Sequence, residues 1–236
     1  MIACTFLYGQ NMNIRNKNVC AHNTYNTHIN YLEALCHSYK ASVSTLLVPT
    51  NNRFGPGPHI VEFDVIFSGA EADEEPSKFA VEMAPLDLMP HSVLLFLEMV
   101  EKQLWDETAF VHHTHHIVSA TPTIYHTGIS KRSEFDKEGL AHVAFQEYTE
   151  EYPHDVYTLG FSGRPGGPDF YISTMDNSQM HGPGGQMDAE LIEEADPCFA
   201  KVIRGFDIVD RIYQKGVVAP LDIHVVGIVS AAITER

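Results

Sequence analysis

The sequence has little positive charge. Its 15 lysine and arginine residues stand against 31 aspartate and glutamate residues, so its formal net charge is −16 at pH 7. A surface of this sign repels phosphate groups, which argues against nucleic acids and anionic membranes as primary partners. We interpret the excess of acid as a solvated surface that aids solubility rather than as a functional patch.

Cysteine is also scarce. The four cysteines are Cys4, Cys20, Cys36 and Cys198, and no two of them form a C-x-x-C pair. This spacing argues against a disulfide framework and against a structural zinc site.

Long apolar runs are missing as well. No stretch approaches the roughly 18 apolar residues that a bilayer-spanning helix needs. The chain starts with a few apolar residues and its charges come after them, which is the reverse of a secretory signal. As written, the chain is expected to be soluble and intracellular, with no membrane partner. A missing upstream targeting or anchor segment would change this expectation.

The chain divides at a hinge. Residues 1–53 are rich in Asn, His, Tyr and Thr, show no strand alternation and have only a weak helical spacing over 28–47. A short amphipathic helix and a poorly structured extension both fit this part. The run Phe54-Gly-Pro-Gly-Pro breaks helix and strand alike, so we place the boundary there, with one domain over 54–236.

After the hinge the patterns predict many short strands and two helices. Strands are predicted over 59–67 and 78–85, which form a hairpin, and over 109–119, 169–174, 198–203 and 224–233. Helices are predicted over 90–103, which begins at Pro90, and over 205–214. These elements favour a mainly β protein, a closed β-barrel with helices at its ends.

Four runs resemble the cyclophilin family of peptidyl-prolyl cis-trans isomerases. They are Pro90-His-Ser-Val-Leu-Leu-Phe96, Leu104-Trp-Asp-Glu-Thr-Ala-Phe110, Gly167-Pro-Asp-Phe-Tyr-Ile-Ser-Thr174 and Phe199-Ala-Lys-Val-Ile-Arg-Gly-Phe-Asp-Ile-Val-Asp-Arg-Ile212. The last run is the most specific, and all four agree in order and register. The resemblance implies a closed antiparallel eight-stranded β-barrel capped by two α-helices. The core residues that it implies are Phe96, Phe110, Phe170, Phe199, Val209 and Ile212.

The resemblance also implies where a proline peptide would bind. The register of Trp105 to Phe110 puts His112 at the position of the family's catalytic arginine. Of the positions that hold the peptide, only Tyr171 keeps its aromatic character. The full set of implied substrate-binding residues is Ile117, Val118, Ala120, Asp169, Tyr171 and Asp196.

The change at His112 bears directly on catalysis. Rotation about an X–Pro bond has a barrier of about 20 kcal/mol, and the twisted amide has a more basic nitrogen. A fixed cationic donor aimed at that nitrogen stabilises the twisted state. A histidine side chain is mostly neutral at pH 7 and offers one donor in place of a rigid cationic fork. Loss of such a donor costs on the order of 10²–10³ in rate, so we predict weak or lost isomerase activity.

Two glycine-proline loops, 163–167 and 181–186, fall where the family has the rim of its peptide groove. Neither has the spacing of a phosphate loop, so nucleotide binding is not expected. Each is either a sharp turn or a rim that recognises an extended, proline-containing segment. Arg164 is a further substrate-binding candidate. We expect its side chain to face solvent, and the alternative is a cation that substitutes for the family arginine.

Four histidines crowd the run His112-His-Thr-His-His116. In a strand, His112 and His116 would share one face and His113 and His115 the other. With Asp169 or His126, such a pair could bind Zn²⁺, Ni²⁺ or Cu²⁺. No third ligand has a standard spacing in the sequence. We therefore expect histidines with satisfied hydrogen bonds or at a groove edge, and we predict no metal and no cofactor.

Three functions stay open. The first is an isomerase-class domain that binds proline-containing peptide or protein segments with weak or lost catalysis. The second is an interaction module without catalysis, and the third is a metal-binding barrel that uses the histidine cluster.

Overall fold

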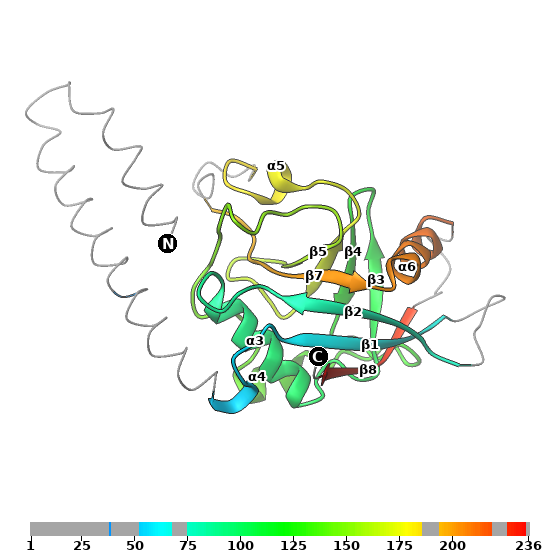
Figure 1. Ribbon diagram of the computed structural model, residues 1–236. Helices are drawn as coiled ribbons and strands as arrows, with labels where there is room; N and C mark the ends of the chain where they lie inside the picture. Colours follow the sequence, from blue (N-terminus) through cyan, green and yellow to red (C-terminus); the bar gives the residue numbers. More distant parts are fainter. Residues whose placement is uncertain (1–37, 39–51, 68–74, 186–193, 219–225, 235–236) are drawn as a thin grey trace, which may run out of the picture.

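The computed structural model of the protein describes residue 38 and residues 52–67, 75–185, 194–218 and 226–234; the side chains of residues 112, 113 and 216–218 are not among those described. Eight strands form a closed antiparallel barrel in the order β1-β2-β7-β5-β6-β4-β3-β8 (Figure 1). The strands are β1 (Ile60–Phe67), β2 (Ser77–Met83), β3 (Thr108–His113), β4 (Ile117–Thr121), β5 (Thr158–Phe161), β6 (Phe170–Ser173), β7 (Cys198–Arg204) and β8 (Val226–Thr234). The predicted barrel is confirmed.

Two helices cap this barrel. Helix α3 (Pro90–Glu101) contacts β7 and β8, and helix α6 (Phe206–Val218) contacts β2 and β3. They lie on opposite sides of the barrel (Figure 1). Pro90 stands in the first turn of α3, where its missing N–H removes no helical hydrogen bond. The sequence did not predict two shorter helices, α4 (Arg132–Glu138) and α5 (Ser178–His181).

Strand alternation explains the predicted hairpin. In β1, Val61, Phe63 and Val65 are fully buried in the barrel, while Glu62 and Asp64 between them point outward. Both carboxylates lie 2.9 Å from the ammonium group of Lys78 in β2. The two strands pair antiparallel over most of their length.

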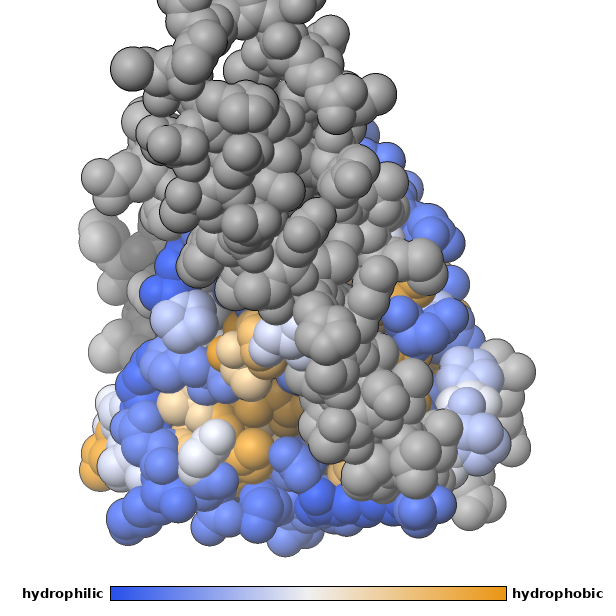
Figure 2. Space-filling model, turned by 90° about the vertical axis from the view of Figure 1, so that its left-hand side faces the viewer, coloured by the Kyte–Doolittle hydropathy of each residue, from blue (hydrophilic) through white to orange (hydrophobic). Residues whose placement is uncertain are grey.

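The described surface is largely hydrophilic on the side that Figure 2 shows. A patch of apolar surface lies among hydrophilic residues in the lower part of this view (Figure 2). Within the described ranges, no helix has both the length and the apolar character needed to cross a bilayer.

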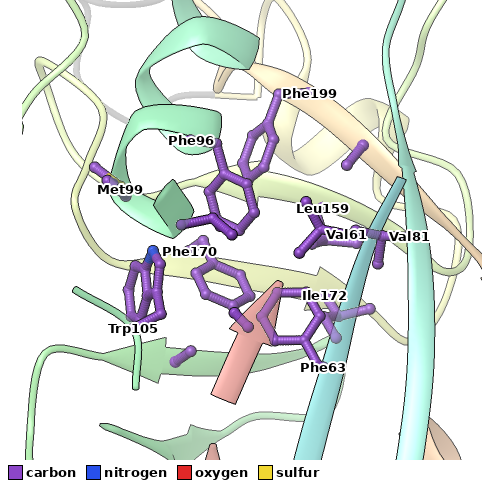
Figure 3. Packing of buried hydrophobic residues seen from close by; sticks show 14 of the residues in the cluster. Val61, Phe63, Val81, Phe96, Met99, Trp105, Leu159, Phe170, Ile172 and Phe199 are labelled. Atoms are coloured by element: carbon purple, nitrogen blue, oxygen red, sulfur yellow. The ribbon is translucent and has the colours of Figure 1, made fainter. Parts of the chain in front are cut away.

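Aromatic rings fill the barrel. Phe96 of α3 reaches into the core, where its ring centroid lies 5.4 Å from that of Phe170 and 4.8 Å from that of Phe199 (Figure 3). Trp105 packs edge-on against Phe170 at 4.7 Å. All six core residues expected from the resemblance are fully buried. The core that the sequence predicted is therefore confirmed.

The predicted strand over 109–119 is divided in the structure. The stretch 109–119 is not one strand, because β3 ends at His113 and β4 begins at Ile117. The N–H of Thr114 donates to the carbonyl of Ile117 and closes the turn between them. The prediction for residues 1–53 falls almost wholly outside the described residues.

A buried carboxylate holds the start of α3. Glu147, 3% exposed, accepts hydrogen bonds from the N–H groups of His91 (2.9 Å) and Ser92 (2.8 Å) and from the hydroxyl of Ser92 (2.7 Å). These N–H groups belong to the first turn, where a helix offers them no internal acceptor. Glu147 therefore acts as a cap supplied from a distant part of the chain.

We predict that Glu147→Ala lowers the free energy of unfolding by about 2–4 kcal/mol, because it leaves buried donors without an acceptor. Urea denaturation at pH 7.5 measures this effect. The exposed Glu150→Ala should change stability by less than about 0.5 kcal/mol. Equal effects of the two variants would contradict the capping role.

Candidate functional site

The outer face of the barrel carries one row of residues across β3, β4 and β6. Phe170 and Ile172 belong to the core, so Tyr171 between them points outward. The Cα of Tyr171 lies opposite that of Ser119 in β4, and Ser119 lies opposite His112 in β3. The backbone of His112 is thus two strands away from Tyr171 in the same row.

Although it points outward, Tyr171 is only 1% exposed. Space for its ring comes partly from β5, where Gly160 lies opposite it. A Cβ at Gly160 would overlap the Tyr171 ring and hydroxyl. Polar side chains provide further cover.

Asp196 is the centre of this cover. We call Asp196, Tyr171, Arg164, His154 and His181 the Asp196 cluster. The Tyr171 hydroxyl donates to Asp196 Oδ2 at 2.8 Å, and His181 Nδ1 donates to the same oxygen at 2.6 Å. The guanidinium of Arg164 forms an ion pair with Asp196 Oδ1. A second carboxylate, Glu194, lies 3.1 Å from Arg164 Nε. The Asp196 side chain itself is only 9% exposed.

His154 closes the cluster from the segment before β5. Its Nε2 donates to the backbone carbonyl of Asp196 at 2.8 Å, and its Nδ1 lies 3.4 Å from the Tyr171 hydroxyl. The Nε2 proton fixes Nδ1 as the unprotonated nitrogen of a neutral ring. Burial lowers the pKa of His154 to about 4. His154 is therefore a neutral part of the cluster at pH 7.

The α5 segment, residues 176–185, lies over this cluster. The ring centroid of His181 lies 4.6 Å from that of Tyr171 and 5.4 Å from that of His116. The backbone N–H of Asn177 donates to His154 and its side-chain N–H donates to His116, both at carbonyl oxygens. The α5 segment thereby connects the β3–β4 turn to the Asp196 cluster.

The electrostatics of the cluster favour an ionised Asp196 and a neutral Tyr171. Burial raises the pKa of Tyr171 well above its usual value, and the Asp196 charge adds to this effect. Burial would also raise the pKa of Asp196, but hydrogen bonds from His181 and Arg164 outweigh it and lower that pKa. The phenol thus remains a donor and the carboxylate an acceptor at neutral pH.

Comparison with known proteins identifies the family. The family model "Cyclophilin type peptidyl-prolyl cis-trans isomerase/CLD" matches residues 71–231, which is more than half of the 236-residue chain. The chain belongs to the cyclophilin family. A comparison with curated proteins by sequence gave no match.

Solved structures show the same fold. A cyclophilin-type peptidyl-prolyl cis-trans isomerase of Cryptosporidium parvum superposes with a TM-score of 0.52 at 14% identity, over 75% of this chain and 98% of that one. A second structure of that protein, in the presence of the dipeptide Ala-Pro, gives a TM-score of 0.51 at 14% identity, over 75% and 99% of the two chains. At this identity the likeness establishes the cyclophilin fold.

The structure brings together three of the cyclophilin site residues that the sequence proposed. Tyr171, Asp196 and Arg164 meet in one cluster. Ile117 is half-buried, with its Cα opposite Ser173 in β6. Asp169, just before β6, lies 3.5 Å from Arg132 in α4.

Val118 and Ala120, which the resemblance assigned to the peptide pocket, have their side chains inside the barrel. Both are fully buried in the barrel core, so their side chains cannot touch a peptide on the outer face. A β-bulge between Phe110 and His112 shifts the register of the β3–β4 pair. A shift of one residue exchanges the two faces of a strand. Ser119, which shares the outer row with Tyr171, is the outward residue between them.

Arg164 does not face solvent as expected, since its side chain is only 17% exposed. The cluster also contains His154 and His181, which the sequence reasoning missed. One signal could have pointed to them. A tyrosine at an aromatic pocket position adds a hydroxyl, and a buried hydroxyl needs hydrogen-bond partners.

The histidine run does not form a two-faced strand, because His115 and His116 lie in the β3–β4 turn. Their ring centroids are 4.6 Å apart. His126, suggested as a further ligand, is exposed and packs against Tyr125. Among the residues described here, no group of three or more His, Cys, Asp and Glu side chains could hold a metal ion.

We expect the buried His154 to make the free energy of unfolding depend on pH. The pKa of His154 is about 4 in the folded protein, against about 6.5 when unfolded. Its neutral form therefore stabilises the fold fully above pH 6.5, and this contribution is lost as the pH falls toward 4. Between pH 7.5 and pH 5 the loss amounts to about 2 kcal/mol.

Urea denaturation at both pH values tests this expectation. His154→Asn should shrink the difference in unfolding free energy between pH 7.5 and pH 5 by about 2 kcal/mol, because asparagine does not titrate. The exposed His142→Asn is the matched control and should leave the difference unchanged. A His154→Asn protein as acid-sensitive as the wild type would contradict the neutral, buried imidazole.

Proposed function

We propose that this cyclophilin domain binds a proline-containing segment on the outer face of β4 and β6 and isomerises it weakly or not at all. The observation that carries the proposal is the burial of Tyr171, 1% exposed, beneath the Asp196 cluster. From the family resemblance, we assign the role of proline-binding aromatic to this residue. A peptide therefore reaches it only after the cover moves.

The charges in the cluster support weak catalysis. Isomerisation needs a cationic donor that is free to approach the proline nitrogen in the twisted state. Arg164 shares Asp196 with Tyr171, and its guanidinium is engaged by Asp196 and Glu194. At the aligned position of the family arginine stands His112. Neither residue supplies a free, permanently charged fork.

Peptide binding is supported by the family and by the relative from Cryptosporidium parvum. A structure of that protein was determined in the presence of Ala-Pro. We extend the same ligand class to this chain, because the two proteins share the cyclophilin fold.

An NMR titration with a tetrapeptide that has a central Ala-Pro bond tests the proposal. Between pH 5 and pH 8 we expect saturable shifts of amides in β4 and β6, centred on Ile117, Ser119 and Tyr171. The cis–trans exchange rate of the bound peptide should stay within about tenfold of the uncatalysed rate. Uncatalysed isomerisation takes about tens to hundreds of seconds. No saturable shift at any pH, or shifts confined to other faces of the barrel, would refute the binding role.

A further inference from the structure

Exposed apolar side chains gather where β5 begins, β6 ends and α6 starts. Five large apolar side chains of the described residues are exposed, and three of them lie here: Val156 and Met175, each 44% exposed, and Phe206, 41% exposed. Together with the half-buried Tyr157, we call them the Val156 patch. Single exposed apolar residues are ordinary on a protein surface, whereas a contiguous group with polar residues around it is typical of an interaction site.

Backbone hydrogen bonds join two parts of the Val156 patch, residues 154–157 and residues 173–177. Tyr157 and Asn177 each donate an N–H to a carbonyl of the opposite segment, both at 2.8 Å. The two segments therefore run side by side beyond the paired strands β5 and β6. Between these two hydrogen bonds, each segment contributes one exposed apolar side chain to the patch.

An aromatic contact joins the start of α6 to these segments. The ring centroids of Tyr157 and Phe206 lie 5.0 Å apart in an edge-to-face arrangement. The hydroxyl of Tyr157 donates to Asp210 Oδ1 in α6 at 2.9 Å, which holds the Tyr157 ring in place. The Phe206 ring is thus supported on one side and exposed on another. Rigid aromatic side chains of this kind lose little conformational entropy on binding and dominate many interfaces.

The charge around the Val156 patch is negative. Residues 154–157, 173–177 and 205–210 contain no lysine and no arginine but four aspartates. Of the basic residues that flank these segments, Arg204 pairs with Glu62 at 3.5 Å and Arg211 lies over the ring of Phe67. A bound partner would therefore meet exposed carboxylates around the apolar side chains. The aspartates are Asp155, Asp176, Asp207 and Asp210, and all four are exposed.

This negative charge decides which kind of partner fits. A second copy of the chain, related by two-fold symmetry, would bring the same aspartates face to face, and like charges repel. Nucleic acids and anionic membranes would be repelled for the same reason. A protein segment that carries lysine or arginine beside apolar side chains complements both the charge and the apolar surface.

We propose that the Val156 patch is a docking surface for a partner protein, which it binds through a segment that combines apolar side chains with lysine or arginine. The apolar side chains of that segment cover the patch, and its positive charges lie beside the surrounding aspartates. This surface goes beyond the proposed function, because it requires neither a proline in the partner nor the uncovering of Tyr171.

NMR titration of the full chain with a synthetic peptide of lysine, leucine and phenylalanine, without proline, tests the proposal. We expect saturable shifts of the amides of Val156, Met175 and Phe206. A peptide with glutamate in place of every lysine should bind at least about tenfold more weakly. An increase in NaCl from about 0.05 M to about 0.5 M should weaken binding of the lysine peptide about fivefold, because salt screens exposed charges. Equal affinities of the two peptides, or shifts confined to other surfaces, would overturn the proposal.

Variants separate the apolar contribution from the charged one. Phe206→Gln should weaken binding of the lysine peptide at least about fivefold, because the exposed ring is lost. Asp155→Asn combined with Asp207→Asn should also weaken it about fivefold and should reduce the effect of salt. The matched control is Ile129→Gln, which removes an apolar side chain outside the patch that is 62% exposed. If folded Phe206→Gln protein bound the peptide as tightly as Ile129→Gln protein, the docking surface would be refuted.

Two further measurements decide between this surface and its alternatives. If the amides of the Val156 patch shift with protein concentration in peptide-free samples, the occupant is a second copy and the proposal fails. A tetrapeptide with a central Ala-Pro bond should shift the amides of Ser119 and Tyr171 and leave that of Phe206 in place. If the lysine peptide binds the patch while the tetrapeptide binds nowhere, the docking surface is upheld and the proline-binding role fails.

Discussion

At pH 7.5 the protein should catalyse isomerisation of an Ala-Pro tetrapeptide with a kcat/KM at least about 10²–10³-fold below that of the Cryptosporidium parvum cyclophilin assayed beside it. Two physical causes combine. The aligned position of the family arginine holds His112, and the cation near Tyr171 is committed to Asp196. Tyr171, which we propose receives the proline ring, is covered.

An arginine introduced at position 112 separates the two causes. His112→Arg alone should raise kcat/KM by less than about tenfold, because Tyr171 stays covered. His112→Arg combined with His181→Gln should raise it further, since the second change weakens the hydrogen bond that holds α5 over Tyr171. Exchange NMR on the tetrapeptide gives these rates directly. A His112→Arg protein as active as the relative would mean that the cover does not limit catalysis.

Arg164→Met should lower the free energy of unfolding by about 3–5 kcal/mol, since it leaves the buried Asp196 charge without its guanidinium partner. The side chains of this ion pair are 17% and 9% exposed. Urea denaturation at pH 7.5 measures the loss. Asp196→Asn in the Arg164→Met background should recover part of it, because the unpaired charge is then gone.

The matched control is Arg132→Met. Arg132 also pairs with an aspartate, Asp169, but its side chain is 43% exposed and the charges lie 3.5 Å apart. Exposed pairs of this kind contribute less than about 1 kcal/mol. Equal losses of unfolding free energy in the two variants would show that burial does not make the Arg164–Asp196 pair more stabilising than an exposed pair.

The sequence predicts the barrel well because its signals are local. Alternating apolar residues in β1 and the spacing of Phe96 and Val100 in α3 each lie within one element. Strand β5 was missed because all four of its residues, Thr158–Phe161, are buried and leave no alternation. Helix α4 was missed because Phe135 is its only buried residue.

The candidate site is harder to predict because its contacts are not local. Asp196 lies 25 residues from Tyr171, 32 from Arg164 and 42 from His154 along the chain. No spacing rule connects such residues, and only the closed barrel brings them together. The inward position of Val118 and Ala120 was not predicted for another reason, since the bulge in β3 has no clear sequence signal.

The solvent exposure of the Tyr171 ring at pH 7.5 tests most directly whether this residue is covered. Relaxation enhancement of ring protons by a soluble paramagnetic agent reports this exposure. We predict that Tyr171 is enhanced as little as Phe170, its neighbour in the core, and far less than Tyr125, which is half-buried. An enhancement as large as that of Tyr125 would show that the proposed proline-binding face is open and would contradict the covered Tyr171.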